Sequence, residues 1–213
     1  MSTAPEALAV PDFLYLASQS PRRRQLLAQI GVRHELLLPG ADEDSEALEA
    51  VQPGEEPADY VQRVTLAKLA AARLRLLSRG LPAAPILCAD TTVAVDSRIL
   101  GKPTDDEHAA LLLQALSGRT HRVLTAVAVS EGPHAAFQPT CVLHISSVRM
   151  RVLQADEIVR YVASGEAHGK AGAYAIQSQA AAWIEHIEGS HSGIMGLPLF
   201  ETAQLLGSLG WQF

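Results

Sequence analysis

The chain has 213 residues and a mass of 22.7 kDa, which corresponds to one large domain or two closely joined lobes. Hydrophobic residues make up 48% and charged residues 19%, a composition that excludes a disordered or collagen-like chain. The formal net charge is −6, but eight acidic residues and no Lys or Arg lie between positions 41 and 59, so the acidity is local.

Without a broad basic face, duplex nucleic acid is not an expected partner. No segment approaches the roughly 18 consecutive apolar residues of a membrane helix, and the first ten residues lack the pattern of a secretory signal. Two cysteines cannot form a disulfide framework. We therefore expect a cytoplasmic protein without a membrane partner.

The first half of the chain predicts two short strands, over residues 13–17 and 32–38, with a helix between them. Ser20 can cap that helix and Pro21 suits its first position. The acidic stretch follows as a loop. Helical spacing of apolar residues then predicts a long helix from about 58 to 79.

In the second half, a buried strand over 86–95 turns back into residues 99–100. Thr104 and Glu107 have the spacing of a capping box at the start of the next helix. Strands and helices alternate without strict order, which predicts an α/β fold with a mixed, twisted sheet. The remaining elements are expected as strands over 121–130, 140–153 and 181–187, helices over 155–164 and 197–206, and a Gly-rich loop over 165–178.

Residues 18–24 (SQSPRRR) place three arginines in the first turn of a helix. The helix dipole favours carboxylates there, so stability alone does not explain this choice. A bound polyphosphate would reverse the balance, because free N–H groups and Arg side chains would converge on its oxygens. Three solvated arginines are the alternative. Consecutive positions on a helix cannot all face one site, so one or two of the arginines are expected to bind substrate.

Asp90 interrupts an apolar strand, where an unpaired buried carboxylate would be costly. It is expected to face a cleft, a metal or a cation, although it could instead cap a turn or bulge. Thr91 offers a hydroxyl beside it, and the return of the hairpin can bring Lys102 near. The chain holds 14 Arg but only three Lys, so each lysine is a candidate for a specific role.

Three other signals fail on inspection. The segment 165–171 lacks the spacing and the Ser/Thr of a phosphate-binding P-loop, although Lys170 can still close over a ligand. The turn at 189–198 has His191 where a nucleophile elbow needs Ser, which leaves a structural turn as the alternative. The histidines and cysteines show no zinc-binding spacing.

These segments together resemble the Maf family of nucleotide pyrophosphatases. The resemblance extends from about residue 13 to 206 and rests on LASQSPRR (16–23), ADT (89–91), GKP (101–103), KAGAYAIQ (170–177) and GLPL (196–199). It implies one inosine triphosphatase-like α/β domain over 13–213, two-lobed with a central cleft, after an N-terminal extension over 1–12. It also implies hydrolysis of a nucleoside triphosphate to the monophosphate and pyrophosphate, assisted by Mg²⁺ or Mn²⁺.

The resemblance also assigns residues. The AYAIQ segment is similar to the subgroup that acts on dTTP and UTP, and the Gln177 amide can donate to O4 and accept from N3–H of the pyrimidine. Gly169 stands where many members have Asp. The implied catalytic residues are Asp90, Glu43, Lys68 and Lys102, with Glu43 and Asp90 also the metal ligands. The implied substrate-binding residues are Ser18, Arg22, Arg23, Thr91, Lys170 and Gln177.

Two other classes of function remain as alternatives. One is a nucleotide-binding regulator of septum formation and cell division without turnover, and the other is an unrelated phosphoryl-transfer enzyme. The expected partner is a nucleoside triphosphate, and a homodimer is left open. Glu43 is singled out from its acidic neighbours only by the resemblance, and the acidic loop could instead be a solvated surface.

Overall fold

The computed structural model describes residues 12–41, 43–44, 46–132 and 138–213, so nearly all of the expected N-terminal extension lies outside the described residues. No helix within these ranges is long and apolar enough to cross a membrane. The elements in chain order are β1 (Leu14–Leu16), α1 (Pro21–Gln29), β2 (His34–Leu36), η1 (Ala47–Glu49), α2 (Pro57–Ser78), β3 (Ile86–Val95), β4 (Arg98–Leu100), α3 (Asp106–Leu116), β5 (Thr120–Ser130), β6 (Thr140–Met150), α4 (Ala155–Ala163), η2 (Ala171–Ala173), η3 (Gln179–Trp183), β7 (Ile184–Glu188), α5 (His191–Met195) and α6 (Leu199–Gly207), where η marks a 3-10 helix.

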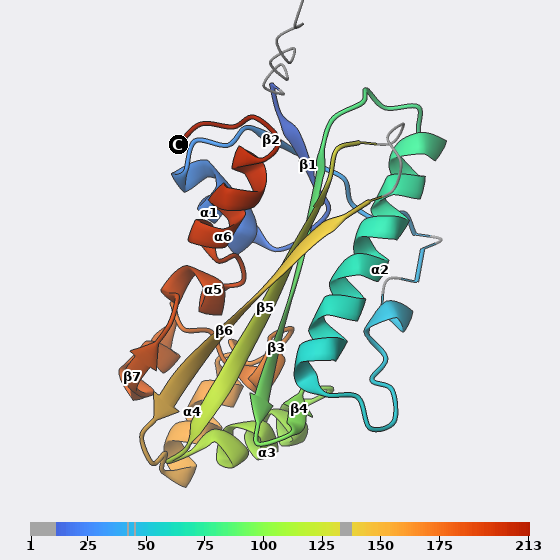
Figure 1. Ribbon diagram of the computed structural model, residues 1–213. Helices are drawn as coiled ribbons and strands as arrows, with labels where there is room; N and C mark the ends of the chain where they lie inside the picture. Colours follow the sequence, from blue (N-terminus) through green and yellow to red (C-terminus); the bar gives the residue numbers. More distant parts are fainter. Residues whose placement is uncertain (1–11, 42, 45, 133–137) are drawn as a thin grey trace, which may run out of the picture.

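The strands form one sheet in the order β2-β1-β3-β5-β6-β7, with β4 paired to β3 (Figure 1). The pairs β1/β2 and β1/β3 are parallel, whereas the pairs β3/β5, β5/β6 and β6/β7 are antiparallel. The expected hairpin of β3 and β4 is present. The prediction of an α/β fold with a mixed sheet is therefore confirmed.

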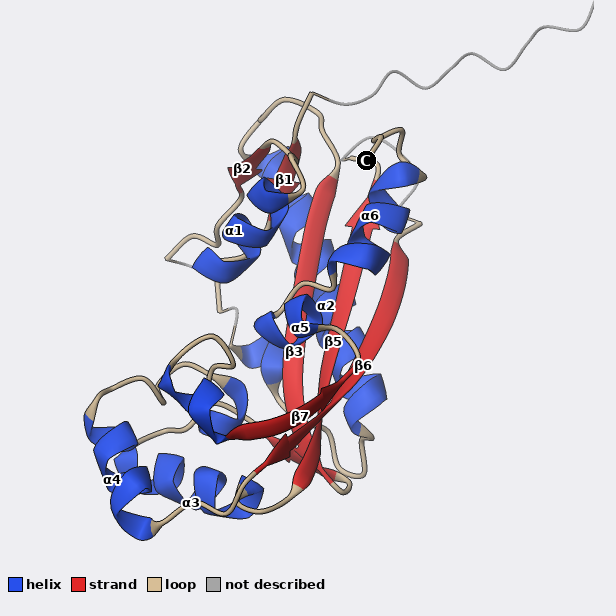
Figure 2. Cartoon of the chain, turned by 90° about the vertical axis from the view of Figure 1, so that its left-hand side faces the viewer, coloured by secondary structure: helices blue, strands red, loops and turns tan. Residues whose placement is uncertain are grey.

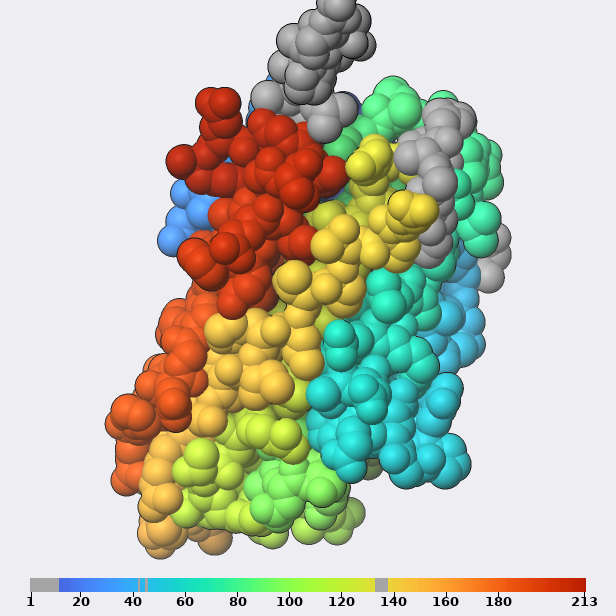
Figure 3. Space-filling model, in the orientation of Figure 1, coloured from blue at the N-terminus to red at the C-terminus, as the bar shows by residue number. Residues whose placement is uncertain are grey.

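Alternate residues of β3 point to opposite faces of the sheet, and near β1 each face is covered by a helix. Cys88 packs in one cluster with Leu69 of α2, whereas Leu87 packs in another with Leu205 of α6. In the space-filling view, α2 flanks β6 on one side and the C-terminal helices flank it on the other (Figure 3). This alternation decides which layer each site residue of β3 meets.

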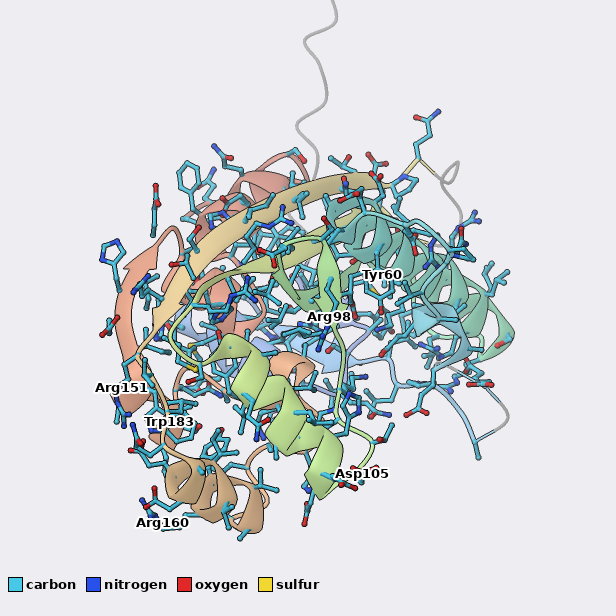
Figure 4. The ribbon with its side chains drawn as sticks, turned by 90° about the horizontal axis from the view of Figure 1, so that it is seen from below. Tyr60, Arg98, Asp105, Arg151, Arg160 and Trp183 are labelled. Atoms are coloured by element: carbon cyan, nitrogen blue, oxygen red, sulfur yellow. The ribbon has the colours of Figure 1, made fainter. Side chains whose placement is uncertain are left out.

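A separate cluster fills the other end of the long strands. Val93 and Val123 pack there against Leu113 of α3 and Tyr161 of α4. Figure 2 shows two groups of elements at opposite ends of β3, β5 and β6. One group contains α1, α6, β1 and β2, and the other contains α3 and α4. Seen from below, Asp105 marks the start of α3 (Figure 4). The two groups correspond to the two expected lobes.

The helix starts are set by side-chain acceptors. Ser20 caps α1 as expected, since its hydroxyl accepts from the Arg23 N–H at 3.5 Å. The prediction of a capping box between Thr104 and Glu107 is wrong. Asp105 caps α3 instead and accepts from the His108 N–H at 2.7 Å. An ionised carboxylate is the stronger acceptor at this position.

Some elements differ in extent from the prediction. The strand expected over 32–38 is only the three residues of β2, because its partner β1 also has three. The strand expected over 181–187 begins later, after the 3-10 helix η3. The turn at 189–198 contains the short helix α5, which was not predicted, and the last helix begins after Pro198.

Candidate active site

A cavity of about 840 Å³ opens where one edge of β3 is uncovered. On this side β1 pairs with Ile86 and Leu87, and β4 pairs only with the end of the strand, from Val93. Among the described strands, none lies beside residues 88–92 on that edge. Ligands of α/β sheets bind in crevices at the carboxyl ends of strands, and β1 ends at this notch.

Both ends of the chain and both lobes contribute to the wall of this cavity. Residues 17–23 and 194–196 come from one side, and residues 168–171 and 174–177 come from the other. The cavity is lined by all the site residues predicted from the sequence, namely Ser18, Arg22, Arg23, Glu43, Lys68, Asp90, Thr91, Lys102, Lys170 and Gln177.

Four charged side chains form a continuous chain at the centre of the site. Lys68 Nζ of α2 lies 2.5 Å from Asp90 Oδ1 and 2.7 Å from Glu49 Oε1. The other carboxylate oxygen of Glu49 accepts from Lys102 Nζ at 2.7 Å. Lys102 thus reaches Asp90 through Glu49 and Lys68, and the structure gives no direct contact between the two. Asp90 points to the same side of β3 as Cys88, which is the side that α2 covers.

The pairing favours the ionised forms of Lys68 and Glu49 although both side chains are partly buried. Burial favours the neutral amine of Lys68, but the carboxylates of Asp90 and Glu49 outweigh it and raise the pKa of Lys68 above its ordinary value. Burial likewise opposes ionisation of Glu49, and Lys68 and Lys102 together outweigh it and lower the pKa of Glu49. Charged ammonium and carboxylate groups therefore coexist in the cavity near neutral pH.

The two arginines at the start of α1 are held by the C-terminal turn of α5. Arg23 donates from Nε to the Gly196 carbonyl at 2.7 Å, and Arg22 Nε donates to the Met195 carbonyl at 3.4 Å. Burial lowers the pKa of both from an ordinary value so high that they stay charged. Arg24 is exposed and does not line the cavity, which agrees with the helical period. The structure thus brings two of the three arginines to one site.

Thr91 lies on the opposite face of β3 from Asp90 and joins the arginine side of the cavity. Its hydroxyl accepts from Arg23 at 3.1 Å and contacts Thr125 Oγ1 at 2.9 Å. Arg23 also donates to Ser18 Oγ at 3.1 Å. Successive residues of one strand therefore serve two halves of the site, a carboxylate on one side and a hydroxyl on the other.

Glu43 lines the cavity but is engaged elsewhere. Its carboxylate lies 2.5 Å from the buried guanidinium of Arg75 and accepts from the Gly40 N–H at 3.0 Å. The hydrogen bonds from Arg75 lower the pKa of Glu43 to about 2. The structure does not bring Glu43 into the cluster around Asp90, where Glu49 stands instead.

The loop after α4 forms the opposite wall. Lys170 Nζ donates to the carbonyls of Glu166 and His168, and burial together with the charge of Arg22 lowers the pKa of Lys170. Gln177 is exposed at the cavity wall, so its amide is accessible to a ligand. Lys170 is not part of the ion-pair chain that links the other two lysines.

Asp90 and Glu49 place two carboxylates close together in the cavity, where they could hold a cation. Within the described ranges, no group of three His, Cys, Asp or Glu side chains could hold a metal ion alone. Asp90 and Glu49 are nevertheless close neighbours, because both bond to the ammonium of Lys68. Mg²⁺ commonly uses only one or two carboxylates and completes its shell with phosphates and waters. The pair suits a cation that also contacts a substrate's phosphates.

Comparison with known proteins identifies the family. A family model described as Maf-like protein matches residues 13–209. The chain belongs to the Maf family. It is 61% identical over 201 residues to a protein named dTTP/UTP pyrophosphatase from Albidiferax ferrireducens, covering 94% of this chain and 98% of that one. A protein of the same name from Cupriavidus pinatubonensis is 62% identical over 197 residues, covering 92% and 96%.

Among solved structures, this Maf chain is similar to a HAM1 protein from Coxiella burnetii. The TM-score is 0.48 with 17% identity, covering 92% of this chain and 98% of that one.

Sequence reasoning about this Maf protein missed Glu49 and the carbonyls of Met195 and Gly196. Glu49 was one of eight acidic residues in a single loop, and nothing in that composition distinguished it. Its position is set by a contact with the long helix that the sequence does not reveal. The hydroxyl of Tyr60, labelled in Figure 4, donates to the Glu49 carbonyl at 2.9 Å and fixes η1 beside α2.

Proposed function

We propose that this protein hydrolyses dTTP and UTP to the nucleoside monophosphate and pyrophosphate. The observation that carries the proposal is the convergence of all three lysines with Arg22 and Arg23 on one cavity around Asp90. Such a set of cations matches the charge of a triphosphate. The relatives named dTTP/UTP pyrophosphatase, about 60% identical over nearly their full length, support the pyrimidine substrates.

The cations divide between binding and chemistry. Arg22, Arg23 and Lys170 bind phosphate oxygens, with Ser18 as a neutral donor beside Arg23. Lys102 and Lys68 neutralise charge as it develops on the leaving pyrophosphate. Gln177 selects the pyrimidine by donating to O4 and accepting from N3–H. Thr91, which holds Arg23, assists that choice of base.

Asp90 accepts the proton of the attacking water or orients that water. Its carboxylate is nearly buried and reaches the cavity, and Lys68 holds it in place. Glu43, the other expected catalytic carboxylate, is committed to Arg75. Glu49 takes the position beside Asp90 in this proposal.

A divalent cation, Mg²⁺ or Mn²⁺, completes the proposal as cofactor. Asp90 and Glu49 would hold it, rather than Asp90 and Glu43 as expected from the resemblance. Such a cation supplies Lewis-acid polarisation of the phosphate oxygens. Free nucleotides are the partners in this proposal, and the cytoplasm is the place where they are met.

A nucleotide panel tests the function. The protein is incubated with dTTP, UTP, CTP, ATP and GTP and with Mg²⁺ or Mn²⁺, and pyrophosphate and orthophosphate are assayed separately. Pyrophosphate release with preference for dTTP and UTP is expected. Tight binding without product would favour a regulator of cell division, and release of orthophosphate would favour a different phosphoryl-transfer enzyme.

The same panel is repeated with Asp90→Asn, which keeps the shape of the side chain and removes its charge. Turnover is expected to fall by about 10²–10⁴-fold, the usual contribution of a general base, with an unchanged circular dichroism spectrum. Turnover near that of the wild type would remove Asp90 from this role.

A further inference from the structure

A second ordered cluster of polar groups lies outside the cavity wall, between β6, α5 and α6. His144 Nδ1 lies 2.6 Å from Glu201 Oε1 of α6, and its Nε2 lies 3.1 Å from Ser146 Oγ. The Ser190 N–H donates to His144 Nε2 at 3.2 Å and to Ser146 Oγ at 3.0 Å. Only the Nδ1–H tautomer serves both sides, since Nε2 must accept from the backbone.

The cluster has the outline of a hydrolytic Ser–His–acid triad but not its accessibility. Ser146 is 1% exposed, so its hydroxyl cannot approach a substrate carbonyl. Besides His144, its hydroxyl contacts the backbone of Ser190. The arrangement therefore holds a segment of backbone in place.

The segment that it holds is the start of α5. Ser190 is the N-cap of this five-residue helix, and its hydroxyl accepts from the Gly193 N–H at 3.0 Å. A side chain at Gly193 would meet the His144 ring at 3.1 Å, and one at Gly189 would meet Ser146 Oγ at 2.7 Å. The helix is thus seated directly on His144 and Ser146. In Figure 3 the C-terminal helices lie against β6.

The other end of α5 carries the acceptors of the substrate-binding arginines. Gly196, which ends the helix, accepts from Arg23, and its N–H is bonded back to Ser192 and Gly193. The Gly193 carbonyl accepts from Thr125, which contacts Thr91. Because α5 is little more than one turn, a shift at Ser190 moves Gly196 as well.

We propose that His144, oriented by Glu201, is a positioning residue that sets the direction of the Arg23 guanidinium through α5. The inference rests on the proposed function only in taking Arg23 as a phosphate-binding residue. Loss of the His144 acceptor lets the start of α5 move and lowers affinity for the triphosphate. His144 itself touches no substrate.

Calorimetric titration of dTTP with EDTA present measures binding without turnover. His144→Ala is expected to weaken binding about ten-fold, the equivalent of one charge-assisted hydrogen bond. His144→Gln, whose amide oxygen can accept from Ser190, is expected to stay within about three-fold of the wild type. His186→Ala, which removes an exposed histidine of β7, is the matched control and should bind normally.

Coupling to Arg23 separates positioning from general stability. Arg23→Lys keeps the charge but loses the planar set of donors that reach Gly196 and Thr91. In that background His144→Ala is expected to change the Kd less than about two-fold, as non-additivity of coupled residues requires. The same factor in both backgrounds would overturn the inference.

Glu201→Ala, at a side chain that is 21% exposed, provides a second variant if His144→Ala fails to fold. It should weaken dTTP binding in the wild-type background and not in Arg23→Lys, and the same fold change in Kd in both backgrounds overturns the inference. If the wild type neither binds nor hydrolyses dTTP, the proposed function has failed. If the wild type binds and His144→Ala binds equally well, the positioning role alone has failed.

Discussion

At the scale of single residues, Lys68 is the link on which the site depends. Its ammonium lies between Asp90 and Glu49, and these two carboxylates would repel each other without it. An unpaired carboxylate as buried as Asp90 would be expensive, so the lysine permits a charged group in the middle of an apolar strand. Substrate and cation must compete with these internal bonds when they bind.

The two glutamates of the acidic loop differ in the partners that they hold, which gives a matched pair of variants. Glu49→Gln weakens the bridge between Lys68 and Lys102, and turnover of dTTP is expected to fall at least about 10²-fold, as for loss of a group at the reacting centre. Glu43→Gln should keep turnover within about three-fold, because its carboxylate serves Arg75. Steady-state kinetics of the two variants show which glutamate matters for turnover. A larger loss of turnover in Glu43→Gln than in Glu49→Gln would return the catalytic role to Glu43.

Glu43 should instead matter for stability. Its loss leaves the buried Arg75 guanidinium without its main partner, and we expect a cost of about 1–2 kcal/mol at pH 7, reduced from the buried limit because Glu43 is partly exposed. The pKa of Glu43 is lowered from 4.5 to about 2 by folding, so this stability is present above pH 4.5 and is lost as pH falls through about 2.

Denaturant unfolding of the wild type and Glu43→Gln across this pH range measures the effect. The difference in the free energy of unfolding should be largest at pH 7 and disappear near pH 2. A difference that does not change with pH would mean that the ionised carboxylate is not the stabilising group.

At the scale of elements, the loop that carries Lys170 is fastened by close backbone contact. Gly172 has φ of 68°, and a side chain there would meet Val93 at 3.0 Å. Gly169 has the same φ of 68°, but nothing lies within 4 Å of its side-chain direction. The two glycines therefore separate the cost of a left-handed backbone from the cost of a clash.

Gly169→Ala is expected to destabilise by about 1 kcal/mol through backbone strain alone. Gly172→Ala adds overpacking against Val93 and should cost about 1–3 kcal/mol more. Thermal unfolding measures both variants. The added Val93→Ala change should recover part of the loss in Gly172→Ala and none in Gly169→Ala; equal losses in the two single variants would contradict the close contact.

At the scale of the whole molecule, the cavity joins the two lobes, so a ligand that fills it should stabilise both. A ligand at 100 times its Kd adds about 2.7 kcal/mol. For a chain of this size, that corresponds to a rise in Tm of about 5–10 °C. Scanning calorimetry of Asp90→Asn with dTTP and Mg²⁺ tests this at greatly reduced turnover, and a rise confined to one of two separate transitions would show that the lobes unfold independently.

The general architecture could be predicted from the sequence because the informative patterns were long. Helical spacing located α2, alternation and apolar runs located β3, β5 and β6, and the exceptional position of Asp90 pointed to the cavity. The convergence of Arg22 and Arg23 on the same cavity followed from their place in the first turn of a helix.

The rest depended on contacts that local patterns do not contain. Helix α5 has five residues and includes Gly193. An apolar repeat becomes visible only over about two helical turns, which need roughly seven residues. Glu49 acquired its position from Tyr60 and from lysines 19 and 53 residues away in the chain. The resemblance preferred Glu43 as the catalytic glutamate. Its carboxylate instead forms an ion pair at 2.5 Å with Arg75, which is distant in the sequence.

The pairing of Arg22 and Arg23 with the carbonyls at the end of α5 joins groups that are 173 residues apart. During synthesis the arginines leave the ribosome first, and at about 5–20 residues per second their acceptors follow roughly 9–35 s later. A nascent chain that stops short of Gly196 already carries Asp90, Lys68 and the long strands, yet its arginines lack the acceptors that orient them. The orientation of both arginines therefore depends on residues near the other end of the chain.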